Sequence, residues 1–203
     1  MTTLGPREVD TLQEVTTIGA GQALTALSRL VGRPVQLDVP EAWVGASPGA
    51  IADFLGALGQ EIFAVAVQLD GLLGGNLLLA LPHRDAARLA AALGHPPGDA
   101  WNALAESALL ECGNVVGSAF VSAIARMTGA RLLLGVPRLA RGGGKECVDA
   151  LVDRELGRVA LAARFTLSAP EPLEGLVLVM PEPARIPRLL AALPVHPWTN
   201  GSS

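Results

Sequence analysis

The chain has 203 residues, a formal net charge of −4 and a pI near 5.4, which suits one domain or two small halves sharing a core. It contains three Trp, four Phe, no Tyr and no run of basic residues, so we expect no nucleic-acid partner. Charged and turn residues interrupt every apolar run, and the N-terminal residues include acids, so we expect a cytoplasmic protein without membrane insertion or a signal peptide.

The first half of the chain predicts a long helix, a strand, a short helix, a hairpin and a closing helix. Asp10 is a candidate N-cap for the long helix, with Gln13 in capping-box position, and Gly32 is a good stop before the strand RPVQLDVP. Residues 61–69 form a strand before a turn signal at Asp70-Gly71, and residues 72–81 form the return strand. A GAG segment at residues 19–21 lies inside the helix, which favours close helix packing over a dinucleotide site.

The second half predicts the same elements in the same order. Its long helix ends at Gly129 before the strand RLLLGVP, and residues 157–168 and 174–181 form the hairpin. Between them, Arg141–Glu146 (RGGGKE) superficially resembles a phosphate-binding loop. It lacks the first Gly of that motif and has Glu146 in place of the hydroxyl residue, so we expect a flexible loop.

The two halves are copies of one unit. Asp10–Pro40 aligns with Ser107–Pro137 without a gap, at a constant offset of 97. We therefore predict a single α+β domain of two repeats, about 8–94 and 100–193, followed by a flexible tail at 194–203. The expected architecture has two-fold pseudo-symmetry, with about six mostly antiparallel strands covered by helices. Because the duplication already supplies a pseudo-two-fold axis, a monomer is the default expectation.

The cysteines and histidines do not form a metal motif. Cys112 and Cys147 are far apart and lack ligand spacing, so buried free thiols are expected. His83, His95 and His196 occur singly. We therefore expect no metal site and no cofactor held by this chain.

A polar pair, Glu111 and Asn114, interrupts the apolar segment SALLECGNVVGSAFVSAIARM. Helical periodicity puts both on the outer face with Ser107, opposite an apolar stripe. The simplest interpretation is a solvated helix face. Asn is a mediocre helix former, however, and its place beside Gly113 weakens the helix without an evident structural return, which points towards function.

The spacing of these residues resembles a known signature. The pattern is Asp or Ser, then Glu after three intervening residues, Asn after two more, and Pro after twenty-two more. It is similar to the signature of the CheC/CheX/FliY family of response-regulator phosphatases. The second half satisfies every position, with Ser107, Glu111, Asn114 and Pro137. The first half has Thr in place of Asn, with Asp10, Glu14, Thr17 and Pro40. The segment TTIGAGQALTALS also resembles the start of CheC proteins, which read NIGAGNAATALS. The resemblance covers about residues 8–193 and is closest to CheC.

The resemblance implies hydrolysis of the phospho-aspartate of a CheY-type receiver in bacterial chemotaxis. Asn114 would orient the attacking water, and Glu111 would pair with the receiver's active-site Lys. The receiver would supply its own Mg²⁺. Thr17 is shorter than Asn, so we expect one working site, Glu111/Asn114, and a degenerate site at Glu14/Thr17.

Two other functions are compatible with the resemblance. One is a binding module without catalysis, like the middle domain of the flagellar switch protein FliM. The other is a regulator of the deamidase CheD, which CheC proteins bind. That role is compatible with a phosphatase that is weak alone.

Overall fold

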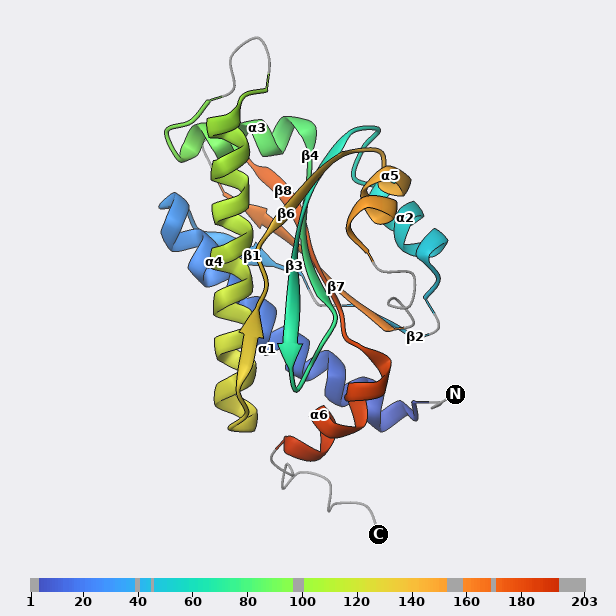
Figure 1. Cartoon of the computed structure of the whole chain (residues 1–203). Helices are drawn as coiled ribbons and strands as arrows, with labels where there is room; N and C mark the ends of the chain where they lie inside the picture. Colours follow the sequence, from blue (N-terminus) through green and yellow to red (C-terminus); the bar gives the residue numbers. More distant parts are fainter. Residues whose placement is uncertain are drawn as a thin grey trace.

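The structure is a computed structural model that describes residues 4–38, 41–44, 46–96, 101–152, 159–168 and 171–193 (Figure 1). Pro40, His196 and the tail expected at 194–203 lie outside these residues. The first half contains α1 (Pro6–Val31), β1 (Val35–Leu37), β2 (Glu41–Val44), α2 (Pro48–Gly56), β3 (Ile62–Gly71), β4 (Asn76–Pro82) and α3 (His83–Ala92). The second half contains α4 (Ala103–Thr128), β5 (Leu132–Leu134), β6 (Arg138–Gly142), α5 (Gly144–Leu151), β7 (Val159–Leu167), β8 (Leu173–Met180), a 3-10 turn η1 (Pro183–Arg185) and α6 (Ile186–Ala192).

The expected α+β fold of two repeats is confirmed. The described strands form one sheet in the order β1-β7-β8-β4-β3-β5, with β2 also paired to β7 and β6 also paired to β3. Every pairing in it is antiparallel. The sheet has eight strands instead of about six because each half adds a short strand, β2 or β6, beside the expected ones.

The halves exchange their short strands. The hairpin strand β3 of the first half pairs with β5 and β6 of the second, and β7 of the second half pairs with β1 and β2 of the first. Neither half could complete its part of the sheet alone. Each half therefore depends on the other's strands for the backbone hydrogen bonds of its part of the sheet.

The register at the centre of the sheet shows the pseudo-two-fold axis. β4 and β8 pair there, and residues 76–82 (NLLLALP) align with residues 175–181 (GLVLVMP). Under that alignment the pair Leu78–Leu178 maps onto the pair Val177–Leu79, and both pairs are present. The duplication seen in the sequence therefore corresponds to a symmetry of the hydrogen-bonded sheet.

Helices cover both faces of the sheet (Figure 1). The long helices α1 and α4 pack against each other on one face, and α2 and α5 pack against each other on the opposite face. Side chains of β3 alternate between the two cores: Phe63 and Val65 face the α1/α4 side, and Ile62 and Ala64 face the α2/α5 side. The two-sided burial explains why β3 and β4 are almost continuously apolar.

The close packing expected at the GAG segment is confirmed at Gly19. A Cβ there would lie 2.5 Å from Cε2 of Phe120, so the absence of a side chain makes room for a ring of α4. Phe120 is itself 1% exposed. The two long helices therefore contact each other through a ring from one and bare backbone from the other.

The ends of the helices agree with the sequence in part. Gly32 and Gly129 close α1 and α4 in the left-handed conformation, with φ of 67° and 66°, as expected. The expectation that Asp10 caps α1 is wrong: the helix begins at Pro6, and Glu8 accepts a hydrogen bond of 2.7 Å from the backbone N–H of Gly5. Pro6 is favourable at the first helical position, which extends α1 by one turn.

The expectation of a flexible loop at Arg141–Glu146 is also wrong. Arg141 and Gly142 belong to β6, which pairs with the start of β3, and α5 begins at Gly144. The glycines serve packing there, since a Cβ on Gly144 would lie 2.1 Å from the carbonyl oxygen of Ala52 in α2. The glycine-rich segment is therefore the site of close contact between α2 and α5.

Helix α4 alone among the described helices is long and apolar enough to cross a membrane, with a mean hydropathy of 1.5 over an 18-residue window. Of that window, 56% is buried inside the domain. Its apolar side packs against α1 and the sheet. The apolarity is therefore that of a core helix.

Candidate functional site

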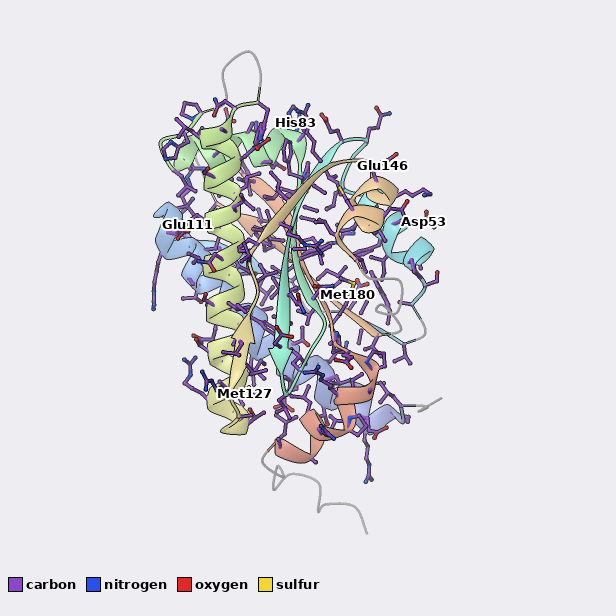
Figure 2. The ribbon with its side chains drawn as sticks, in the orientation of Figure 1. Asp53, His83, Glu111, Met127, Glu146 and Met180 are labelled. Atoms are coloured by element: carbon purple, nitrogen blue, oxygen red, sulfur yellow. The ribbon has the colours of Figure 1, made fainter. Side chains whose placement is uncertain are left out.

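Helix α4 presents the predicted site residues on its outer face. Ser107, Glu111 and Asn114 are exposed, while Leu109, Cys112 and Val116 are buried against the core. Glu111 lies on the side of α4 away from β3 (Figure 2). The spacing i, i+3 makes Glu111 and Asn114 neighbours on that face, about 5–6 Å apart at Cβ in a regular helix. The helical periodicity read from the sequence is confirmed for this half.

An open groove of about 540 Å³ joins this face to the turn between β5 and β6. Four of its lining residues come from α4 and four from the end of β5 and the following turn: Ser107, Leu110, Glu111 and Asn114; Leu134, Gly135, Val136 and Pro137. Pro137 is the last position of the sequence signature. Between Asn114 and Pro137 the chain completes α4 and returns along β5. This return places Pro137 beside Glu111 and Asn114, although it is far from them in the sequence.

Strand β3 holds the helix and the turn at fixed positions. Leu134 pairs with Leu69, and Arg138 pairs with Ala66, so β5 and β6 hydrogen-bond to successive parts of β3. Between them, the N–H of Gly135 donates to the carbonyl oxygen of Gln68 at 2.9 Å. The turn therefore has a backbone anchor directly beside the groove.

The groove carries a single formal charge. Among the described residues that line it, Glu111 is the one carboxylate, and none is Lys, Arg or His. Neither Glu111 nor Asn114 makes a side-chain hydrogen bond or ion pair with another residue in the described part of the chain. The Ser107 hydroxyl, by contrast, donates to the carbonyl oxygen of Ala103 at 2.9 Å. Glu111 and Asn114 are therefore available to an external partner.

The first half has a different arrangement on α1. Asp10, Glu14 and Thr17 are exposed in the corresponding positions. The Thr17 hydroxyl donates to the carbonyl oxygen of Gln13 at 2.8 Å, one turn back in the same helix. A Thr in this geometry has its donor engaged by the backbone, unlike the amide of Asn114. The structure therefore brings the motif of the second half together in one groove, while Pro40 of the first half lies outside the described residues.

The two residues between Glu111 and Asn114 both face the core. Cys112 is fully buried, and burial raises the pKa of its thiol to about 12, with a further contribution from the nearby Glu111 carboxylate. Cys147 is also a buried free thiol, as expected. Gly113 is buried against β3 on the same face as Leu109 and Val116; helical periodicity indicates that face, but the strand residue that Gly113 meets could not be read from the sequence.

Val136 is the other residue that sequence reasoning missed. It lines the groove and is 84% exposed, which is unusual for a large aliphatic side chain. Its position between the Gly and Pro of GVP was the available signal, since a turn tip places its central side chain outward. No cluster of three His, Cys, Asp or Glu side chains that could hold a metal occurs in the described ranges.

Comparison with known proteins shows which folds and sequences this chain resembles. No family model matches the chain. The structure of FliY from Thermotoga maritima superposes with a TM-score of 0.67 and 16% identity, covering 94% of this chain and 98% of that one. A CheX–CheY–BeF3–Mg complex from Borrelia burgdorferi gives a TM-score of 0.55 and 16% identity, covering 81% of this chain and 96% of that one. The chain therefore has the fold of these FliY and CheX structures.

The sequence similarity lies with CheC. The chain is 28% identical over 138 residues to the CheY-P phosphatase CheC of Bacillus subtilis (strain 168), a match that covers 66% of each protein and so just under two thirds of the relative's length. It is 25% identical over 168 residues to the putative CheY-P phosphatase CheC1 of Halobacterium salinarum, covering 81% of this chain and 85% of that protein. The family resemblance expected from the motif is confirmed.

Proposed function

We propose that this domain is an aspartyl-phosphate phosphatase for a CheY-type receiver and that Glu111 and Asn114 carry the activity. The observation that supports the proposal is the groove, in which the Glu111 carboxylate and the Asn114 amide lie beside the Pro137 turn without a side-chain partner among the described residues. The names of the two CheC relatives point to the same reaction. The domain would act in the cytoplasm, where the receivers of chemotaxis signalling reside.

The charge of the groove favours a substrate that brings its own cations. A phosphoryl group in transfer carries negative charge on its equatorial oxygens, which must be neutralised. The described lining of this groove offers no cation for that purpose. A receiver domain supplies a Mg²⁺ ion and a Lys around its phospho-aspartate, so the phosphatase needs to add only geometry.

Asn114 would provide that geometry. Its carboxamide can accept a hydrogen bond from water through Oδ1 and donate another through Nδ2, which holds one water molecule in line with the phosphorus atom. The water oxygen bonds to phosphorus, the bond from phosphorus to the aspartate oxygen breaks, and the free carboxylate leaves. The water protons remain with the phosphate product and its surroundings, so no cofactor of this chain is required.

Glu111 would set the register of the two proteins. One helical turn from Asn114 and exposed, it can pair with the receiver's active-site Lys. Such a pairing fixes where the amide meets the phosphoryl group. A general base is not required for an acyl phosphate whose leaving group is a carboxylate, so we assign Glu111 to docking.

The first half would be a degenerate site. The hydroxyl of Thr17 is shorter than an amide by an atom and a branch, and it already donates to Gln13. A displacement of about 1 Å in a positioning group costs on the order of a hundredfold in rate. Glu14 could still contact a receiver, but hydrolysis there would be slow. We therefore propose one working site per chain.

A phosphate-release assay with a phosphorylated receiver from the same genome tests this assignment. Asn114→Ala should lower the turnover by about a hundredfold, whereas the matched variant Thr17→Ala in the other half should retain the wild-type rate. Glu111→Ala should mainly weaken the apparent affinity for the receiver. Full activity of Asn114→Ala would overturn the assignment.

A non-catalytic binding module is the second candidate. The FliM structure in the Helicobacter pylori FliM–SpeE complex superposes with a TM-score of 0.63 and 10% identity, so the fold alone does not distinguish a scaffold from a phosphatase. A wild-type domain that binds the receiver without releasing phosphate would support the scaffold. Measuring turnover with and without CheD would show whether a partner of that kind raises a weak intrinsic activity.

A further inference from the structure

Gly113 lies between the two site residues and faces the sheet. A Cβ built on it would be 2.3 Å from Cγ1 and 3.1 Å from Cβ of Val65 in β3. Atoms essentially never approach that closely, so a methyl group there would require α4, β3 or the Val65 side chain to move. One turn further along, a Cβ on Gly117 would meet Leu134 and Val67 at ordinary contact distances of 3.4–3.6 Å. Of these two glycines, Gly113 therefore has the closer approach to the sheet.

That contact lies on the buried face of the helix segment whose outer residues, Glu111 and Asn114, line the groove. Val65 pairs with Leu139 of β6, and Gln68 of the same strand accepts the hydrogen bond from Gly135. Strand β3 therefore supports both walls, the helix through Gly113 and the turn through its backbone. The height of α4 above β3 then determines how far Asn114 and Glu111 lie from the Pro137 turn.

The size of the effect follows from the distances. Moving a Cβ from 2.3 Å to an acceptable 3.4 Å from Cγ1 of Val65 requires about 1 Å of movement, and any part that the Val65 side chain does not absorb displaces the helix. A displacement of that size is enough to disable a group that positions a water molecule. The first half has Thr16 at the corresponding position, and this residue is 2% exposed. Helix α1 therefore carries a β-branched side chain where α4 presents bare backbone.

We propose that Gly113 is a positioning residue of the phosphatase site: it lets α4 lie directly on Val65, and this contact sets the position of Asn114 over the receiver's phosphoryl group. The inference rests on the proposed function. It also implies that the first half lacks two requirements of the site, the amide and the close contact of its helix with the sheet.

Restoring the space should restore the activity. Gly113→Ala should lower kcat by about ten- to a hundredfold, with a smaller change in KM, because Glu111 remains on the surface to dock the receiver. Val65→Ala removes the Cγ1 methyl that an Ala at position 113 would meet at 2.3 Å and leaves the Cβ of residue 65 at 3.1 Å, a contact that a shift of a few tenths of an ångström relieves. The double variant Gly113→Ala/Val65→Ala should therefore recover most of the kcat of Val65→Ala. Gly117→Ala is the matched control in the same helix and should keep kcat within about twofold of wild type, because its new methyl makes ordinary contacts.

Thermal unfolding of all four variants separates position from stability. If Gly113→Ala is too unstable to assay, the double variant against Val65→Ala still measures the effect of the added methyl. An active wild type whose Gly113→Ala variant keeps the wild-type kcat would overturn the inference alone, as would a loss that the Val65→Ala change fails to reverse. A wild-type domain that hydrolyses no receiver phosphate would instead overturn the proposed function and this inference with it.

Discussion

Replacing Val136 by Ala should weaken the encounter with the receiver without affecting the chemical step. Val136 lines the groove beside Glu111 and Asn114 and is 84% exposed, so an apolar surface on a docked receiver would cover it. The substitution removes the equivalent of two CH₂ groups, each contributing about 0.8 kcal/mol when fully buried. The loss is therefore at most about 1.6 kcal/mol, and at about 1.36 kcal/mol per tenfold change it raises KM by about five- to fifteenfold.

Steady-state phosphate release over a range of receiver concentrations measures this change. The kcat should remain within about twofold of wild type, and the melting temperature should not change appreciably, since an exposed side chain contributes little to folding. Val44→Ala is the matched control: Val44 is 50% exposed on β2, which pairs with β7 at the other end of the sheet from the groove. An unchanged KM for Val136→Ala, or an equal rise for Val44→Ala, would refute the reasoning.

Two further predictions concern titratable groups. Burial raises the pKa of Cys112 to about 12 and that of Cys147 to about 11, in each case with a contribution from the adjacent Glu carboxylate. At pH 8 about one Cys112 thiol in ten thousand and about one Cys147 thiol in a thousand would then be ionised. Alkylation should therefore be slow until guanidinium unfolds the protein and exposes both thiols. Because these pKa values lie above the unfolded value of 9.0, the contribution of the two thiols to stability is complete below pH 9 and is lost as the pH rises towards 11. Urea titrations of the wild type and of Cys112→Ala at pH 8 and pH 10 would detect this loss. The hydrogen bond from Arg141 lowers the pKa of the Glu61 carboxyl, and the nearby charges of Arg141 and His83 act in the same direction. That stabilisation is present above the unfolded pKa of 4.5 and lost as the pH falls through the lowered folded value, so the stability difference between wild type and Arg141→Gln should shrink at acid pH; a constant difference from pH 7 to pH 3 would contradict the assignment.

The sequence by itself determined those features that depend on neighbours along the chain. The outer face of α4 could be read because residues three and four apart share a helix face, and Glu111 and Asn114 are exposed as expected. Gly32 and Gly129 could be read as helix ends because a left-handed C-cap strongly favours Gly. The duplication was visible because both copies kept the same order and spacing of elements.

Only the tertiary structure decided which distant segments meet. Backbone pairing with remote segments decides the exchange of short strands between the halves and the membership of Arg141 and Gly142 in β6. Packing against α2 likewise decides that α5 begins at Gly144. The same holds for the groove, where Pro137 reaches Asn114 because both α4 and the turn rest on β3. Gly113 shows the reason most directly: nothing in ECGN indicates a neighbour at 2.3 Å, because that neighbour, Val65, comes from the other repeat and contacts Gly113 only after the sheet has assembled.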